Sequence, residues 1–268
     1  MYPTIEFFGV KIWIFGTLMS ISWLLFVTLL HQFSWKKWFT RPIFSDRSII
    51  FFTLSLFLFA RIWYIFSEWR NEQFIVKELF TGHFLSFLKL FFTPENYHFS
   101  LFGGIFWFFL VFFWSTRTIQ HDRLRYFDAI IWAFLYSSLL GYFAALLGGQ
   151  IYGIPFDSFF SIIYTHKESI VGLPVSKVFP LPVVYMFWVS AILLALTHFE
   201  KKFGELPDGF IGYLALGLYS GLVFLWEFLN GSQDMFQSYF LLNLNQIGAL
   251  LGIIISLLWI FRNIEKKI

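Results

Sequence analysis

Residues 127–147 read FDAIIWAFLYSSLLGYFAALL, and Asp128 is the only charged side chain among them. A helix needs about 20 predominantly apolar residues to cross the hydrocarbon core of a bilayer. This stretch meets that length, and a helix satisfies all its backbone hydrogen bonds internally, as the lipid environment requires. The sequence therefore predicts a transmembrane helix here.

Six further stretches approach the same length and are similarly apolar. They cover residues of about 9–31, 48–67, 101–115, 178–198, 209–229 and 244–262. The stretch 101–115 is short and begins near Gly103-Gly104, where we expect a structural turn or a broken entry into the membrane. Together these stretches predict an all-α, polytopic integral membrane protein. We expect about seven transmembrane helices in a single domain over residues 1–268.

Composition narrows the class of protein. Hydrophobic residues make up 58% of the chain and charged residues 13%, whereas a soluble domain carries about 25% charged residues. The net charge of +3 is small and scattered, which argues against nucleic acid as a partner. There is no cysteine, so disulfides and a cysteine nucleophile are excluded. No histidine or carboxylate stands at a metal-ligand spacing from His98, and we expect neither a metal nor a cofactor.

Basic residues between the predicted spans indicate the orientation, because cytoplasmic connections are enriched in Lys and Arg. One side of the membrane receives twelve of them and the other six, and the six lie in the longer connections, where the rule weighs less. We therefore predict an N-terminus outside and a C-terminus in the cytoplasm. The external segments are then about 68–98 and 149–177.

Two ionisable residues fall inside apolar stretches, Arg61 in the second and Glu227 in the sixth. Such groups are costly in a bilayer and need a partner or a function. Both lie toward the external ends of their spans, and three interpretations are open. They form a structural ion pair, Arg61 binds an anionic headgroup, or both snorkel to the interface. Asp128 is expected to act as an N-terminal carboxylate of its own helix, favoured by the dipole.

Glycines mark the end of the fourth span, where residues 148–155 read GGQIYGIP. Because glycine readily adopts the left-handed conformation that ends helices, we expect structural turns at Gly149 and Gly153. The pair Asn230-Gly231 likewise predicts an ordinary helix stop after Glu227.

Short motifs along the chain resemble, in order, those of one membrane-enzyme family. They are MYPTI at 1–5, IFG at 14–16, ARIWY at 60–64, FSLFGG at 99–104 and GYFAALLGGQIYG at 141–153, followed by Tyr219, Glu227 and Gln246. Their order and spacing are similar to those of the prolipoprotein diacylglyceryl transferases. The resemblance covers nearly the whole chain and implies a multi-pass protein of the bacterial inner (cytoplasmic) membrane.

The resemblance also implies a reaction, the transfer of diacylglyceryl from phosphatidylglycerol to the cysteine of a prolipoprotein. Phosphatidylglycerol is thus an implied partner, and so are prolipoproteins or other membrane proteins. That chemistry needs cations to hold the phosphate and a group that helps to deprotonate the thiol. The candidates for contact with a lipid headgroup are Arg61, Tyr64, Gln150 and Glu227.

Several polar positions of the family's site are replaced in this chain. Phe102 stands where the family has histidine, Tyr142 and Val223 stand where it has arginine, and Gln150 stands where it has glutamate. Loss of two arginines removes the obvious phosphate clamp. We therefore assign no catalytic residue and favour a relative with lost or altered activity that binds lipid or lipoprotein. The alternatives are an active phosphatidylglycerol–prolipoprotein diacylglyceryl transferase and a small-molecule transporter or channel.

Overall fold

The computed structural model divides into two compact units. The first comprises Met1–Pro42 and His121–Ile268, and the second comprises Ile43–Gln120. The structure describes residues 4–7, 10–36, 46–67, 75–78, 80–92, 101–115, 117, 123–165, 177–204, 206–231 and 242–265. Whether residues 1–268 form a single domain, as the sequence predicts, stays a prediction.

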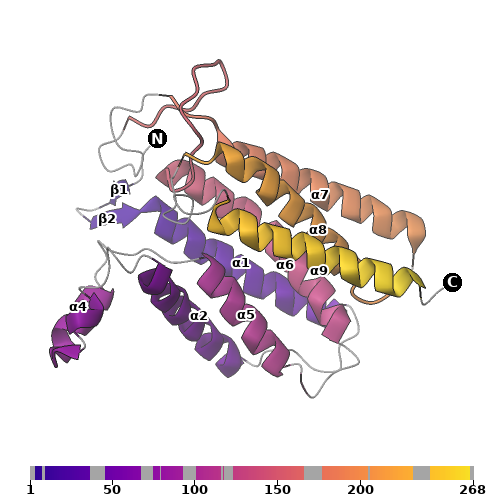
Figure 1. Cartoon of the computed structure of the whole chain (residues 1–268), viewed down its shortest axis with the longest axis horizontal. Coiled ribbons are helices and arrows are strands. Elements are labelled where there is room, and N and C mark those ends of the chain that lie inside the picture. The colour runs from indigo at the N-terminus through magenta and orange to yellow at the C-terminus, as the bar shows by residue number, and fades with distance from the viewer. Residues whose placement is uncertain are drawn as a thin grey trace. The chain divides into compact units, whose positions relative to one another are not determined.

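Five long helices and a short hairpin make up the described part of the first unit (Figure 1). The hairpin pairs β1 (Thr4–Phe7) with β2 (Val10–Trp13) in antiparallel register. The helices are α1 (Ile14–Lys36), α6 (Arg123–Gly148), α7 (Leu181–Phe203), α8 (Phe210–Trp226) with its 3-10 extension η2 (Glu227–Leu229), and α9 (Leu244–Glu265). All five are long and apolar enough to cross a membrane. An all-α, polytopic membrane protein is therefore confirmed.

The first predicted span begins later than expected. Residues 10–13 form β2, and α1 starts at Ile14 instead of near residue 9. Val10, Ile12 and Trp13 favour strand conformation, and pairing with β1 satisfies their backbone groups without a helix. At its C-terminal end the helix is longer than predicted, because it continues to Lys36 instead of ending near residue 31.

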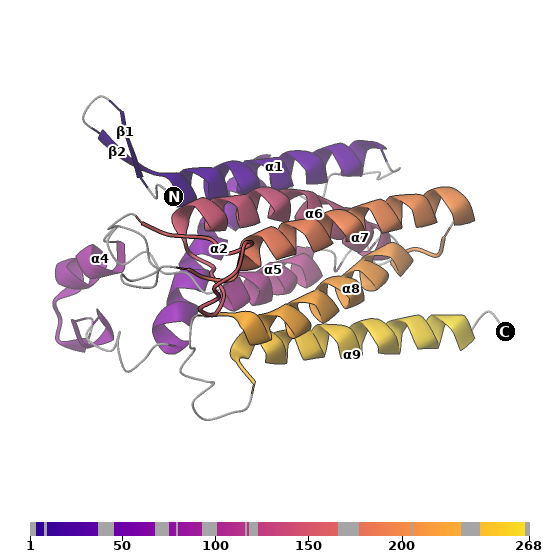
Figure 2. The ribbon, with the colours of Figure 1, turned by 90° about the horizontal axis from the view of Figure 1, so that it is seen from above.

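Helix α6 lies at the centre of the first unit. It packs against α1, α7 and α8, while α9 packs against α8. Figure 2 shows α1 on one side of α6, with α7 and α8 on the other. Half of the α6 span is buried, which fits a helix that is apolar around most of its circumference.

Small residues allow α8 and α9 to approach closely. A Cβ added at Gly217 would collide with the side chain of Ser256, and one added at Gly252 would collide with Ser220. The Ser256 hydroxyl also donates to the Tyr213 carbonyl. Such packing is typical of membrane helices, because lipid tails are as apolar as leucine and association depends on close contact and hydrogen bonds.

The carboxylate of Asp128 caps α8 and not its own helix. The backbone N–H groups of Gly209 and Gly212 donate to its two oxygens at 2.8 and 2.6 Å. Helix α6 begins at Arg123, so Asp128 lies beyond the first turn, and the prediction that it serves its own N-terminus is wrong. The carboxylate instead lies at the N-terminus of α8, which packs against α6, and interacts favourably with the dipole of that helix.

We expect Asp128→Ala to lower the free energy of unfolding by about 1–2 kcal/mol, because the first N–H groups of α8 lose their acceptor. The measurement is thermal unfolding of the purified protein in detergent. Asp157→Ala is the control, since among the described residues Asp157 forms an exposed ion pair with Lys177 at 2.6 Å, and exposed pairs contribute little. Equal melting of the two variants would contradict the capping role.

The described part of the second unit includes the helices α2 (Asp46–Ser67), α4 (Phe84–Phe92) and α5 (Leu101–Ser115). Helices α2 and α5 pack together. The Trp107 indole donates to the Ser55 hydroxyl at 2.9 Å and its ring stacks on Phe59 with centroids 4.7 Å apart. The other two predicted spans correspond to α2 and α5.

The turn predicted at Gly103 and Gly104 is wrong. Both residues lie in the first turn of α5. A Cβ at Gly104 would lie 3.8 Å from Ala60 and 3.9 Å from Leu56, both on α2. In this apolar setting, glycine therefore serves close helix packing and not chain reversal.

The basic residues of the first unit lie as the predicted orientation requires. Arg125, Lys201, Lys202 and Arg262 are at the end of the bundle opposite the hairpin, on the side of the C-terminus (Figure 1). At that end Arg125 also pairs with Asp208 at 2.9 Å. The external N-terminus and cytoplasmic C-terminus stay a prediction, which this clustering supports.

Candidate functional site

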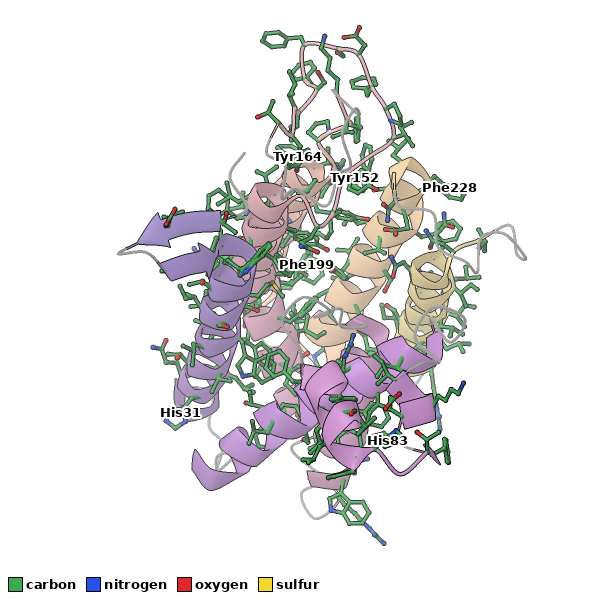
Figure 3. The ribbon with its side chains drawn as sticks, turned by 90° about the vertical axis from the view of Figure 1, so that its left-hand side faces the viewer. His31, His83, Tyr152, Tyr164, Phe199 and Phe228 are labelled. Carbon is green, nitrogen blue, oxygen red and sulfur yellow. The ribbon has the colours of Figure 1, made fainter. Side chains whose placement is uncertain are left out.

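Hydrogen-bonded polar side chains from several helices gather at the end of the first unit that carries the hairpin. Helices α6 and α8 end there, α7 and α9 begin there, and the segment after α6 folds against them (Figure 1). Figure 3 shows Tyr152 and Tyr164 on that segment, and Phe228 on η2. In the predicted orientation, this is the external end.

Three tyrosines connect the middle of this end to a buried carboxylate. The Tyr142 and Tyr219 hydroxyls share a hydrogen bond of 2.6 Å. The ring of Tyr142 stacks on that of Tyr185, with centroids 4.8 Å apart and planes inclined by 10°. The Tyr185 hydroxyl then donates to Oε2 of Glu227 at 3.0 Å. Residues from α6, α7, α8 and η2 thus meet in one polar network.

Glu227 is the carboxylate at the centre of the network, and its residue is only 6% exposed. Its Oε1 accepts hydrogen bonds from Nδ2 of Asn230 and Nδ2 of Asn245, both at 2.6 Å. With Tyr185, this gives the carboxylate three donors, all uncharged. Among the described residues of the first unit, the groups that hydrogen-bond to this carboxylate are therefore a phenol and two amides, and none of them is a cation.

The two positions where the resemblance predicts arginine lie in one apolar cluster. Its buried centre is Leu181, Tyr185 and Leu222, and the partly buried side chains packed against it are Tyr142, Ile151, Phe179, Val223 and Trp226. Tyr142 and Val223 therefore share a neighbourhood next to Glu227, although they come from different helices. At the two positions where the resemblance predicts arginine, this chain has the phenol side chain of Tyr142 and the isopropyl side chain of Val223.

The segment after α6 is fixed to the end of α8 by backbone hydrogen bonds. Gly149 has a φ of 67°, the left-handed conformation that ends many helices and that the expected turn needs. Gly153 donates to the Phe179 carbonyl at 3.1 Å and forms a bridge with Asn230. A Cβ at Gly153 would lie 2.6 Å from Cβ of Phe179. Gly153 therefore allows three chain segments to touch, and the turn expected there stays a prediction.

Gln150 lies between these two glycines and is partly buried. Its backbone N–H donates to the Ala145 carbonyl at 3.1 Å. Among the described residues, its side chain makes no hydrogen bond to Glu227 or to the tyrosines. A contact of Gln150 with a headgroup stays a prediction.

Tyr164 fastens the same segment to the end of α6. Its buried hydroxyl donates to the Leu146 carbonyl at 3.0 Å, one of the carbonyls that the helix itself leaves without a partner. The residue packs with Val178, Tyr152 and Ile162 outside the membrane-spanning helices. Burial raises the pKa of Tyr164 to about 12.

We expect Tyr164→Phe to lower the free energy of unfolding by about 1–2 kcal/mol below pH 10, because the Leu146 carbonyl loses its donor. The folded pKa lies above the ordinary value of 10.0, so the folded state holds the proton more tightly than the unfolded one. The difference between wild type and variant should therefore shrink as the pH rises from 10 toward 12. Denaturant unfolding across that range measures both effects, and a constant difference would contradict the second.

The other candidate residues belong to the second unit. Arg61 on α2 is 2% exposed, and its guanidinium carbon lies 6.0 Å from the centroid of the Phe91 ring, within the range of a cation–π contact. Its ion pair with Glu227 stays a prediction. The side chains of Tyr64 and Phe102 lie outside the described residues, as does His98.

The sequence reasoning missed Tyr185 and Asn245 as partners of Glu227. It read Asn230 only as a helix stop, which is confirmed because η2 ends at Leu229, but the Asn230 amide also binds the carboxylate. A usable signal was position, since Asn230 and Asn245 lie beside the ends of apolar stretches and Tyr185 lies about two turns inside one. Such ends meet in one layer when helices cross a membrane side by side.

A comparison with protein families matches nearly the whole chain. The family model described as prolipoprotein diacylglyceryl transferase covers residues 3–262. A search of curated proteins gives no match. The matched region includes both units and the polar network.

Proposed function

The chain belongs to the prolipoprotein diacylglyceryl transferase family, and from that premise we propose that it is a lipid-binding member whose transferase activity is lost or altered. It acts in the bacterial inner membrane, with its lipid held at the external end of the first unit. The family match supports a membrane protein with a lipid partner. Loss of the reaction is inferred from the site.

The charge of the site carries the proposal. The family reaction displaces an anionic phosphate group, which needs positive charge to hold it. Here Tyr142 and Val223 are neutral, and the buried Glu227 has three neutral donors. The described neighbours of this site are neutral, so they offer an anionic leaving group no positive charge where the reaction requires it.

Arg61 favours a second candidate, the active phosphatidylglycerol–prolipoprotein diacylglyceryl transferase. It is a buried cation retained from the family pattern, and a single arginine holds a phosphate through paired hydrogen bonds. In this alternative, Arg61 alone would hold the phosphate of the donor lipid.

Rescue of a transferase-depleted bacterial strain tests the two candidates. The readout is lipidation of a reporter prolipoprotein, with an intact family enzyme as the positive control and membrane insertion verified for each protein. We expect no lipidation from this chain, whereas lipid extracted from the purified protein should be present in about equal molar amount. Restored lipidation that Arg61→Gln abolishes would establish the second candidate. Absence of any bound lipid would contradict the binding role.

A further inference from the structure

Near the start of α9 lies a buried glutamine, Gln246, whose side-chain oxygen accepts a hydrogen bond while its side-chain nitrogen donates none to the described residues. Gln246 is 1% exposed. Its Oε1 accepts from the backbone N–H of Asn243 at 2.9 Å, and its own N–H donates to Oδ1 of Asn243 at 2.8 Å. This reciprocal arrangement is a capping box. Because a backbone N–H must face Oε1, the orientation of the amide is determined and Nε2 points to the other side.

The Nε2 group of Gln246 has no hydrogen-bond partner among the residues that the structure describes. Native proteins leave few buried donors in that state, and each one asks for an explanation. The first N–H groups and the dipole of α9 also make this helix end attractive to an oxygen atom. A ligand oxygen that accepts from Nε2 would satisfy the group.

Glu227 supplies the complementary half of the cluster. Its carboxylate offers about four acceptor positions, and three are taken by Tyr185, Asn230 and Asn245. Asn245 is the chain neighbour of Gln246, so the two groups belong to the same end of α9. Within the described residues, one acceptor position on Glu227 is therefore left over beside the unpaired donor on Gln246.

Resting on the proposed lipid-binding role, we infer that this cluster holds an uncharged, hydroxyl-bearing lipid headgroup, such as the sugar of a glycosyl diacylglycerol. A hydroxyl group both donates and accepts, so it can donate to Glu227 while a neighbouring oxygen accepts from Gln246. A phosphate would bring negative charge to the Glu227 carboxylate. An ammonium group has donors only and would leave Nε2 of Gln246 unsatisfied.

Competition between defined lipids tests this inference. The full-length protein, stripped of lipid in detergent, is mixed with equal amounts of glucosyl diacylglycerol, phosphatidylglycerol and phosphatidylethanolamine with matched acyl chains. Native mass spectrometry then counts the bound species. We expect the glucosyl lipid to be retained about tenfold over phosphatidylglycerol.

Two variants examine the contact of Gln246. Gln246→Leu should weaken binding of the glucosyl lipid by about five- to tenfold, the effect of one lost hydrogen bond. Gln246→Glu keeps the acceptor of the capping box and replaces the amide donor with a carboxyl oxygen, so it should retain the helix cap and lose the same binding. Asn263→Leu is the matched control, since Asn263 lies on α9 at the opposite end and bonds to the Trp259 carbonyl.

The outcomes separate the inference from the function on which it rests. Preference for phosphatidylglycerol would overturn the inference and leave a lipid-binding protein. Binding of the glucosyl lipid that neither Gln246 variant changes would overturn the assigned contact. Failure to bind any of the three lipids would count against the proposed function itself.

Discussion

Replacement of Glu227 by leucine should lower the free energy of unfolding by about 3–5 kcal/mol. The change leaves the donors of Tyr185, Asn230 and Asn245 without their acceptor, and a buried donor without a partner costs about 1–3 kcal/mol. These donors come from α7, from the end of η2 and from α9, so the effect extends across the end of the first unit that carries the hairpin. Thermal unfolding in detergent should show a Tm lower by about 6–15 °C.

Glu227→Gln is the matched control for this substitution. Glutamine keeps one carbonyl oxygen for the two asparagines and replaces the oxygen that accepts from Tyr185 with a donor. We expect it to melt between the wild type and Glu227→Leu. If the leucine variant melted at the temperature of the wild type, the network would have no role in stability.

Gly153→Ala should destabilise the protein by about 2–3 kcal/mol, because the site has no room for one more methyl group. The added Cβ would lie 2.6 Å from Cβ of Phe179, 2.8 Å from the Phe179 carbonyl oxygen and 3.1 Å from that of Leu229. Two of these neighbours are backbone atoms, so the main chain itself must move. That movement would also disturb the bridge to Asn230, and we expect less co-purified lipid together with the lower Tm.

Gly221→Ala provides the comparison for Gly153→Ala. An added Cβ at Gly221 on α8 meets no atom within 4 Å, and alanine is favoured over glycine inside a helix. The variant should therefore be as stable as the wild type or slightly more so. Equal loss of stability in both glycine variants would argue against the crowding at Gly153.

Local patterns predicted some of the site but could not predict its contacts. Glu227 stood out because a carboxylate in an apolar stretch needs a partner, and the structure supplies Tyr185, which is 42 residues away. From the sequence, Tyr142 was noted only because it stands where the family has arginine. In the structure its hydroxyl shares a hydrogen bond with that of Tyr219, which is 77 residues away in the chain. Polar residues that are distant in sequence become neighbours because several apolar helices of similar length end in the same layer.

The glycine predictions show the same limit. Gly149 has the positive φ that a turn needs, which is a local property. Gly104 lies within a helix, and at Gly104 and Gly153 the missing side chain makes room for Ala60 and for Phe179 respectively. Whether a glycine turns the chain or admits a neighbour depends on what packs against it, which a single stretch of sequence does not specify.

By itself, the sequence determined that the chain spans a membrane, that it is helical and where most of its helices lie. Those properties follow from the free energy of placing long apolar segments in lipid, which depends on local composition. The tertiary structure alone decided that Asp128 caps α8 instead of its own helix and that Glu227 meets three neutral donors. Hydrogen bonds act over about 3 Å, so only the packing of the helices determines which polar groups come within their reach.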